Sequence, residues 1–197
     1  MQPVTQTIPP SPLERLLFQD PRSAPLWLIV RLITGWEWLT GGWEKLFDPA
    51  WTGPDSGQAI VGFVNRALPQ TQGAHPNVTG WYAWFLQYVV APNASAWAWA
   101  ITLGELAVGL GLIVGLFTGV AAFFGGLMNA SYLLGGTVST NPILFILATW
   151  LVLAWKVAGW WGLDRWVLPR LGTPWWPGRR GEAAAPAEEP PSVPRAA

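Results

Sequence analysis

The residues AWAWAITLGELAVGLGLIVGLF (96–117), followed after Thr118 by GVAAFFGGLMNASYLLGGTV (119–138), decide the fold. The two runs together contain a single charged side chain, Glu105, in the first run. At about 1.5 Å rise per residue, each is long enough to span a hydrocarbon core of about 30 Å. Lipid offers the backbone no hydrogen-bond partner, so such runs must be helices. The short link between them predicts an antiparallel helical hairpin in a membrane.

Two further apolar runs, at about 26–47 and 143–161, complete the pattern. Together the four runs predict an all-α membrane protein with a bundle of four transmembrane helices, formed by residues 25–168. A polar, proline-rich segment, 1–24, precedes this domain. The tail 169–197 is rich in Pro, Ala and Glu, a composition typical of disorder.

The composition agrees with a membrane protein and excludes several kinds of redox site. Charged residues make up 11% of the chain, and the 16 tryptophans suit a lipid–water interface. Zero net charge gives no reason to expect nucleic acid as a partner. With no cysteine and one histidine, we expect no haem, iron–sulfur or metal site in this chain. A redox role would therefore need a diffusible carrier, a substrate or a partner subunit.

The connection 48–95 is too long to be a simple link and contains two amphipathic segments. One predicted helical face is formed by Ile60, Phe63, Val64 and Ala67. A second is formed by Trp81, Trp84, Phe85, Tyr88 and Val89, before Pro92. We expect two helices that lie on the membrane surface or cap the bundle.

The distribution of basic residues predicts the orientation. The two ends of the chain carry Arg15, Arg22, Arg165, Arg170, Arg179, Arg180 and Arg195. The positive-inside rule then places both termini in the cytoplasm of a prokaryotic cell, with a multi-pass domain in the plasma membrane. The long connection and the turn 139–142 would face outward. In that turn, Pro142 suits a first helical turn, with Asn141 or Thr140 as the cap.

Charged residues inside the predicted spans are candidates for function because charge is costly in lipid. Counting along the helices puts Glu37 and Glu105 about 18 Å from the cytoplasmic ends of their helices. Asn129 has a similar depth, while Arg31 and Lys156 lie nearer the cytoplasm. We expect these five residues to form one polar core.

The role of that core has two interpretations. Neighbouring carboxylates can share a proton or pair with Arg31, which suits quinone chemistry. Alternatively, an Arg–Glu pair only holds helices together. Glu37 could instead face a partner subunit, and Lys156 could extend to the membrane surface. His75, in the long connection, could bind an anionic substrate or move a proton, or do neither.

Glycines accompany these residues. Arg31, Trp38 and Lys45 recur every seven residues in the first helix, beside Gly35 and Gly42. The second helix contains Gly104, Gly111 and Gly115. Small residues let helices approach closely, so packing is the predicted role, with room for a ligand beside Glu105 as the alternative.

Several motifs resemble the DoxX/DoxD-like family of four-helix membrane proteins over about residues 25–168. They are RLITG (31–35), GWEKLF (42–47), GELAVGLGLIVGLFT (104–118), MN (128–129) and GTVSTNP (136–142). The long connection, with TQGAHPN (71–77) and WYAWF (81–85), is more similar to the DoxD branch.

This resemblance implies a membrane subunit of a thiosulfate:quinone oxidoreductase. Thiosulfate would be oxidised to tetrathionate, quinone would be the electron acceptor, and a DoxA-like second subunit would be the partner. The family's polar positions match Arg31, Lys45, Glu105 and Asn129. We therefore expect catalytic roles for Glu105 and Arg31. Substrate or quinone binding is expected for Glu37, Asn129, Lys45, His75 and Lys156.

Two other functions fit the sequence. The chain could be a non-catalytic membrane subunit that stabilises a larger redox or respiratory complex. It could also form a small-molecule transporter, as a homo-oligomer, although the sequence contains no inverted repeat.

Overall fold

The computed structural model describes residues 10–172, and this part of the chain is helical, without a β-strand. The all-α prediction is therefore confirmed for these residues. Four helices are long: α2 (Ala24–Leu46), α6 (Ala94–Val114), α7 (Thr118–Leu134) and α8 (Asn141–Leu153). The first nine residues of the predicted polar segment and most of the predicted disordered tail lie outside the described residues.

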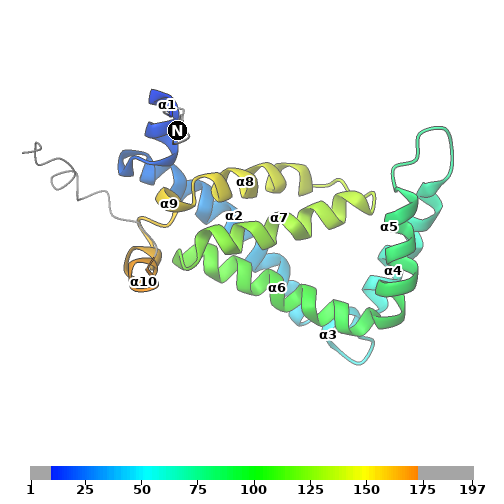
Figure 1. Cartoon of the computed structure of the whole chain (residues 1–197). Helices are drawn as coiled ribbons and strands as arrows, with labels where there is room; N and C mark the ends of the chain where they lie inside the picture. Colours follow the sequence, from blue (N-terminus) through cyan, green and yellow to red (C-terminus); the bar gives the residue numbers. More distant parts are fainter. Residues whose placement is uncertain (1–9, 173–197) are drawn as a thin grey trace, which may run out of the picture.

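The four long helices form a closed ring. Helix α2 packs against α6 and α8, and α7 packs against the same two helices, so α2 and α7 occupy opposite corners. Three short helices lie at what we call the terminal end: α1 (Pro12–Phe18), α9 (Trp155–Ala158) and α10 (Asp164–Arg170) (Figure 1). The opposite, loop end carries α3 (Pro49–Thr52), α4 (Gln58–Ala67) and α5 (Gly80–Phe85).

Length and hydropathy single out one clear membrane span in the described part of the chain. The continuous helical run Gly80–Val114 is long and apolar enough to cross a bilayer, whereas α7 and α8 are shorter apolar helices. Helix α2 has 23 residues, but Arg31, Glu37, Glu44 and Lys45 lower its hydropathy. The count of four spans remains a prediction.

The helix ends differ from the predicted ones for local reasons. The predicted third helix extends to residue 138, but α7 ends at Leu134 before two glycines, of which Gly136 has a φ of +77°. The predicted fourth helix is broken at Ala154, between α8 and α9. Pro142 lies in the first turn of α8 as expected, although the Thr140 side chain makes no capping bond.

Helices α2 and α6 touch backbone to backbone through glycines. A Cβ atom on Gly42 would lie 2.9 Å from the backbone nitrogen of Leu106, and one on Gly109 would lie 2.5 Å from that of Leu39. A Cβ on Gly35 would lie 3.1 Å from the Gly109 carbonyl oxygen. The packing role predicted for Gly35 and Gly42 agrees with this, and Gly109 is an additional contact that the sequence interpretation missed.

The helices at the loop end pack one face against the bundle. Helix α4 buries Ile60, Val64 and Ala67 of the predicted face. The predicted aromatic face lies on α5 and the π-helical turn Leu86–Val90, and it points outward: Trp81, Trp84 and Tyr88 are exposed. The residues that pack inward are Tyr82, Ala83, Leu86 and Val90. The segment therefore covers the bundle with one side and presents aromatic rings on the other.

Candidate functional site

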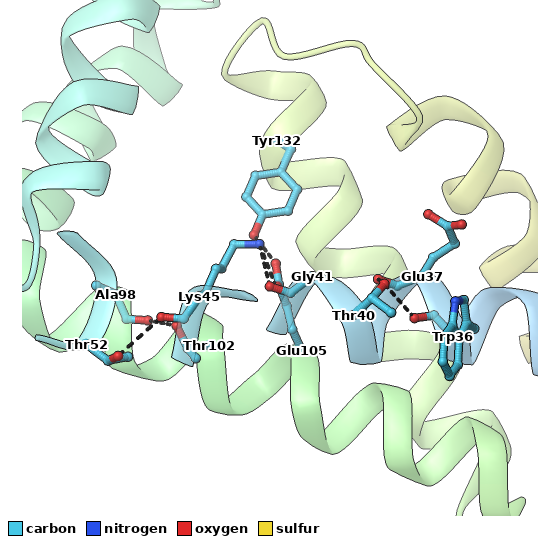
Figure 2. Close-up of polar contacts among 10 residues, drawn as sticks. All are labelled: Trp36, Glu37, Thr40, Gly41, Lys45, Thr52, Ala98, Thr102, Glu105 and Tyr132. Atoms are coloured by element: carbon cyan, nitrogen blue, oxygen red, sulfur yellow. Dashed lines mark hydrogen bonds and ion pairs between the residues drawn. The ribbon is translucent and has the colours of Figure 1, made fainter. Parts of the chain in front are cut away.

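Glu105, in the middle of α6, is held by side chains from two other long helices. It is 2% exposed. One carboxylate oxygen, Oε2, lies 2.8 Å from Lys45 Nζ of α2, and Oε1 accepts a 2.8 Å hydrogen bond from Tyr132 Oη of α7 (Figure 2). We call Lys45, Glu105 and Tyr132 the Glu105 cluster. It ties three of the four long helices together.

Local structure explains how Lys45 reaches the carboxylate. Gly41 lies one turn earlier in α2, and a Cβ there would lie 3.5 Å from Glu105 Oε2. Lys45 Nζ also donates to the Gly41 carbonyl oxygen at 3.3 Å and lies 5.0 Å from the ring centre of Trp51. The Lys45 side chain is 22% exposed. Lys45 is therefore less buried than Glu105.

The loop end holds the tyrosine of the cluster in place. The Tyr132 ring packs edge-on against Phe63 of α4, with 6.4 Å between ring centres. One residue earlier, the Ser131 carbonyl oxygen accepts a 2.7 Å hydrogen bond from Tyr82 Oη of α5. Both contacts tie α7 to the long connection.

Glu105 has the partners that a buried carboxylate needs. A buried carboxylate is stabilised by an ammonium partner and by hydrogen bonds to both oxygens. This is the one ion pair among residues 10–172. The carboxylate accepts hydrogen bonds from a hydroxyl group and an ammonium group. A carboxylate held in this way can accept a proton.

Two buried polar groups lie in the centre of the bundle without hydrogen-bond partners. Trp38 of α2 reaches across to α7, where a Cβ on Gly125 would lie 3.0 Å from its Nε1 atom. Asn129 is one turn further along α7, between Gly125 and Tyr132. Asn129 is 0% exposed, and neither atom of its amide has a partner; Trp38 Nε1 has none either. Such groups are costly, and in native proteins they often mark function.

Arg31 lies in a different place, at the terminal end of the bundle. It is 1% exposed and donates to the carbonyl oxygens of Ala158, at 3.1 Å, and Trp161, at 3.0 Å. These acceptors belong to α9 and the turn after it. Arg31 thus binds the backbone that follows α8 and is not a partner of Glu105.

Asp164 completes this second cluster. Its carboxylate accepts hydrogen bonds from the backbone nitrogens of Phe117, at 2.6 Å, and Thr118, at 2.8 Å, at the start of α7. Its own backbone nitrogen donates to the Gly115 carbonyl oxygen at 2.8 Å. Arg31 and Asp164 also attract each other electrostatically. We call these two residues the Arg31–Asp164 cluster; it caps a helix and closes the α6–α7 hairpin.

The predicted single polar core is wrong in its membership. Glu37 is exposed on α2, and its carboxylate points away from Glu105 (Figure 2). Lys156 is exposed, with its Nζ atom 5.6 Å from the ring centre of Trp155. His75 is exposed in the connection before α5. Counting residues gave the depth of these groups along the helices but not the direction in which each side chain points.

The sequence interpretation missed Tyr132 of the Glu105 cluster and Asp164 of the Arg31–Asp164 cluster. Tyr132 follows Asn129 by three positions, so it shares the Asn129 face of the helix, and this spacing could have identified it. Trp38 was recognised only as part of a packing pattern. Asp164 is 46 positions away from the helix start that it caps, and nothing local in the sequence points to it. Among residues 10–172, no three His, Cys, Asp or Glu side chains gather where they could hold a metal ion.

The described residues are all helical, include one apolar run long enough to cross a bilayer and hold an ion pair between helices, which is typical of an integral membrane protein. The chain belongs to the DoxD family: the family model described as TQO small subunit DoxD matches residues 26–175. The predicted family is therefore confirmed. Comparisons with curated proteins and with solved structures gave no match.

Proposed function

We propose that this chain is the membrane subunit of a thiosulfate:quinone oxidoreductase and takes part in passing electrons from thiosulfate to quinone. The family description supports this, since it names a small subunit of such an enzyme. The observation that carries the proposal is the Glu105 cluster, a buried ion pair joined by a tyrosine hydroxyl.

The cluster suits the proton balance of the reaction. Two thiosulfate ions lose two electrons as the sulfur–sulfur bond of tetrathionate forms, and quinone takes up those electrons with two protons. Glu105 would accept a proton and pass it on, with Tyr132 as its hydrogen-bond partner. Lys45, the partly buried cation of the cluster, would attract the thiosulfate anion.

The quinone would use the unpartnered donors of the bundle centre. The Trp38 indole N–H and the Asn129 amide can both donate to a carbonyl oxygen. The cavity lined by Phe123, Trp155 and Leu168 does not border these groups, so quinone entry requires a side-chain shift. Met128, whose sulfur would lie 3.5 Å from a Cβ on Gly104, is a flexible side chain at this position. Arg31 would support the reaction only by holding the hairpin.

We further propose four membrane crossings in a prokaryotic plasma membrane, with the terminal end in the cytoplasm. The two ends of the described chain lie on the same side of the bundle, as an even number of crossings requires (Figure 1). Arg15, Arg22, Arg165 and Arg170 lie at this end. A DoxA-like subunit, or a second copy of this chain, would bind from outside or within the bilayer. Glu37 and His75, both exposed, are available for such contacts.

One observation favours a non-catalytic subunit instead. Both oxygens of Glu105 already have protein partners, which is what a purely structural ion pair requires. In that case the chain would hold a larger redox complex in the membrane.

The test is thiosulfate-dependent reduction of a water-soluble quinone analogue by membranes that contain this chain, with and without a DoxA-like subunit. Glu105→Gln should abolish most of the activity. Glu44→Gln, an exposed carboxylate in the neighbouring helix, is the matched control and should keep it. If both variants keep wild-type activity, Glu105 has no catalytic role. Absence of activity even with the partner subunit supports the non-catalytic alternative.

A further inference from the structure

A cavity of about 350 Å³ opens at the terminal end of the bundle, away from the Glu105 cluster. Its walls come from the start of α7, from α8 and α9, and from α10; Figure 1 shows α10 beside the start of α7. The lining is apolar and includes Phe123, Val152, Trp155 and Leu168. A cavity of this size and polarity is typical of a site for an apolar ligand.

The cavity is open toward the side on which lipid would lie. Val120 and Phe123, which line it, are 55% exposed and belong to the outward face of α7. One wall contributes Thr118, whose buried hydroxyl oxygen has no hydrogen-bond partner in the protein. An apolar chain could fill the cavity beside this buried hydroxyl.

One basic side chain lies beside the cavity. Lys156 follows the lining residue Trp155, and its Nζ atom lies 5.6 Å from the centre of that ring. Lys156 is exposed and forms no ion pair with a carboxylate in the described part of the chain. A ligand with an apolar body and an anionic head would meet both parts of this surface.

We infer that this cavity binds an anionic phospholipid, with an acyl chain between α7, α8 and α10 and the phosphate at Lys156. Charge complementarity selects this occupant over a neutral lipid or a quinone, since neither of these carries a net negative charge to balance the lysine. The site does not depend on the proposed redox function, because it shares no residue with the Glu105 cluster.

The experiment measures lipid retention by the purified full chain with native mass spectrometry, after exchange into equal amounts of phosphatidylglycerol and phosphatidylcholine. The wild type should retain phosphatidylglycerol preferentially. Lys156→Gln should lower that preference about fivefold, as expected for loss of one basic residue near a membrane surface. Arg66→Gln, an exposed arginine at the loop end, is the matched control and should leave the preference unchanged.

A second variant tests the apolar part. Val120→Trp, at an exposed position of the wall, fills the cavity from outside and should lower retention of both lipids. Equal retention of the two lipids by the wild type would overturn the proposal. So would displacement of bound phosphatidylglycerol by equimolar ubiquinone, since this would assign the cavity to quinone.

Discussion

The Glu105 cluster and the Arg31–Asp164 cluster are both buried and charged, but their hydrogen bonds go to different kinds of partner. Glu105 binds two side chains, Lys45 and Tyr132, whereas Arg31 and Asp164 bind backbone groups at helix ends. Backbone groups at helix ends need partners in any membrane-embedded fold. The comparison shows that the terminal cluster closes helix ends, whereas the Glu105 cluster joins three helices through side chains.

The strongest test of this difference is Asp164→Ala. It removes the acceptor of two backbone N–H groups and the carboxylate near Arg31, so the free energy of unfolding should fall by about 3 kcal/mol. Denaturant unfolding in detergent measures this loss. Asp55→Ala, in an exposed turn, is the control and should change stability by less than about 0.5 kcal/mol. A similar small change for Asp164→Ala would remove the structural role of the terminal cluster.

Glu105→Gln should lower stability by less, about 2 kcal/mol, because it leaves Lys45 without its ion-pair partner. The double variant Lys45→Met with Glu105→Gln removes the uncompensated charge and should recover at least half of that loss. Quinone reduction should be lost in both variants. If the double variant is as unstable as the sum of its single changes, Lys45 and Glu105 are not energetically coupled.

Asn129→Leu separates function from stability most directly. The amide has no partner in the bundle, so an apolar side chain of similar size should raise stability by about 1 kcal/mol. Quinone reduction should nevertheless fall, measured on the same preparation. A variant that is less stable than the wild type would show that the amide is satisfied in the native membrane, for example by bound water.

Tyr132→Phe should have the smallest effect on stability, about 0.6 kcal/mol, since it removes one hydrogen bond and keeps the ring against Phe63. Thermal unfolding in detergent measures the shift, with Tyr88→Phe, at an exposed position, as the control. A loss of activity much larger than the loss of stability would support proton transfer through the hydroxyl.

Periodicity predicted much of the fold. Apolar run length located α2 and α6 closely, and the seven-residue spacing correctly placed Arg31, Trp38 and Lys45 on the inward side of α2. Glu37 was wrongly placed in the polar core. It is the sequence neighbour of the buried Trp38, so its side chain points about 100° away from that of Trp38 at nearly the same depth. Depth along a helix can be counted from sequence, but direction requires the packing partners.

The partners of each site were the least predictable part. Lys45 bonds a residue 60 positions away, and Asp164 caps a helix that begins 46 positions earlier. Such pairs are chosen by how the helices stack, which single-sequence patterns do not contain. The break at Ala154 was also missed because its neighbours are uniformly apolar and continue the helical pattern.

The π-helical turn Leu86–Val90 has a consequence for how this family can diverge. A π-turn holds one residue more than an α-helical turn, and each residue turns the helix by about 100°. Gain or loss of a single codon here would therefore rotate the outward aromatic face of α5 relative to α6. The Glu105 cluster, in α6 beyond the turn, would keep its partners. Evolution could thus change the outer surface of the protein while conserving the ion pair inside it.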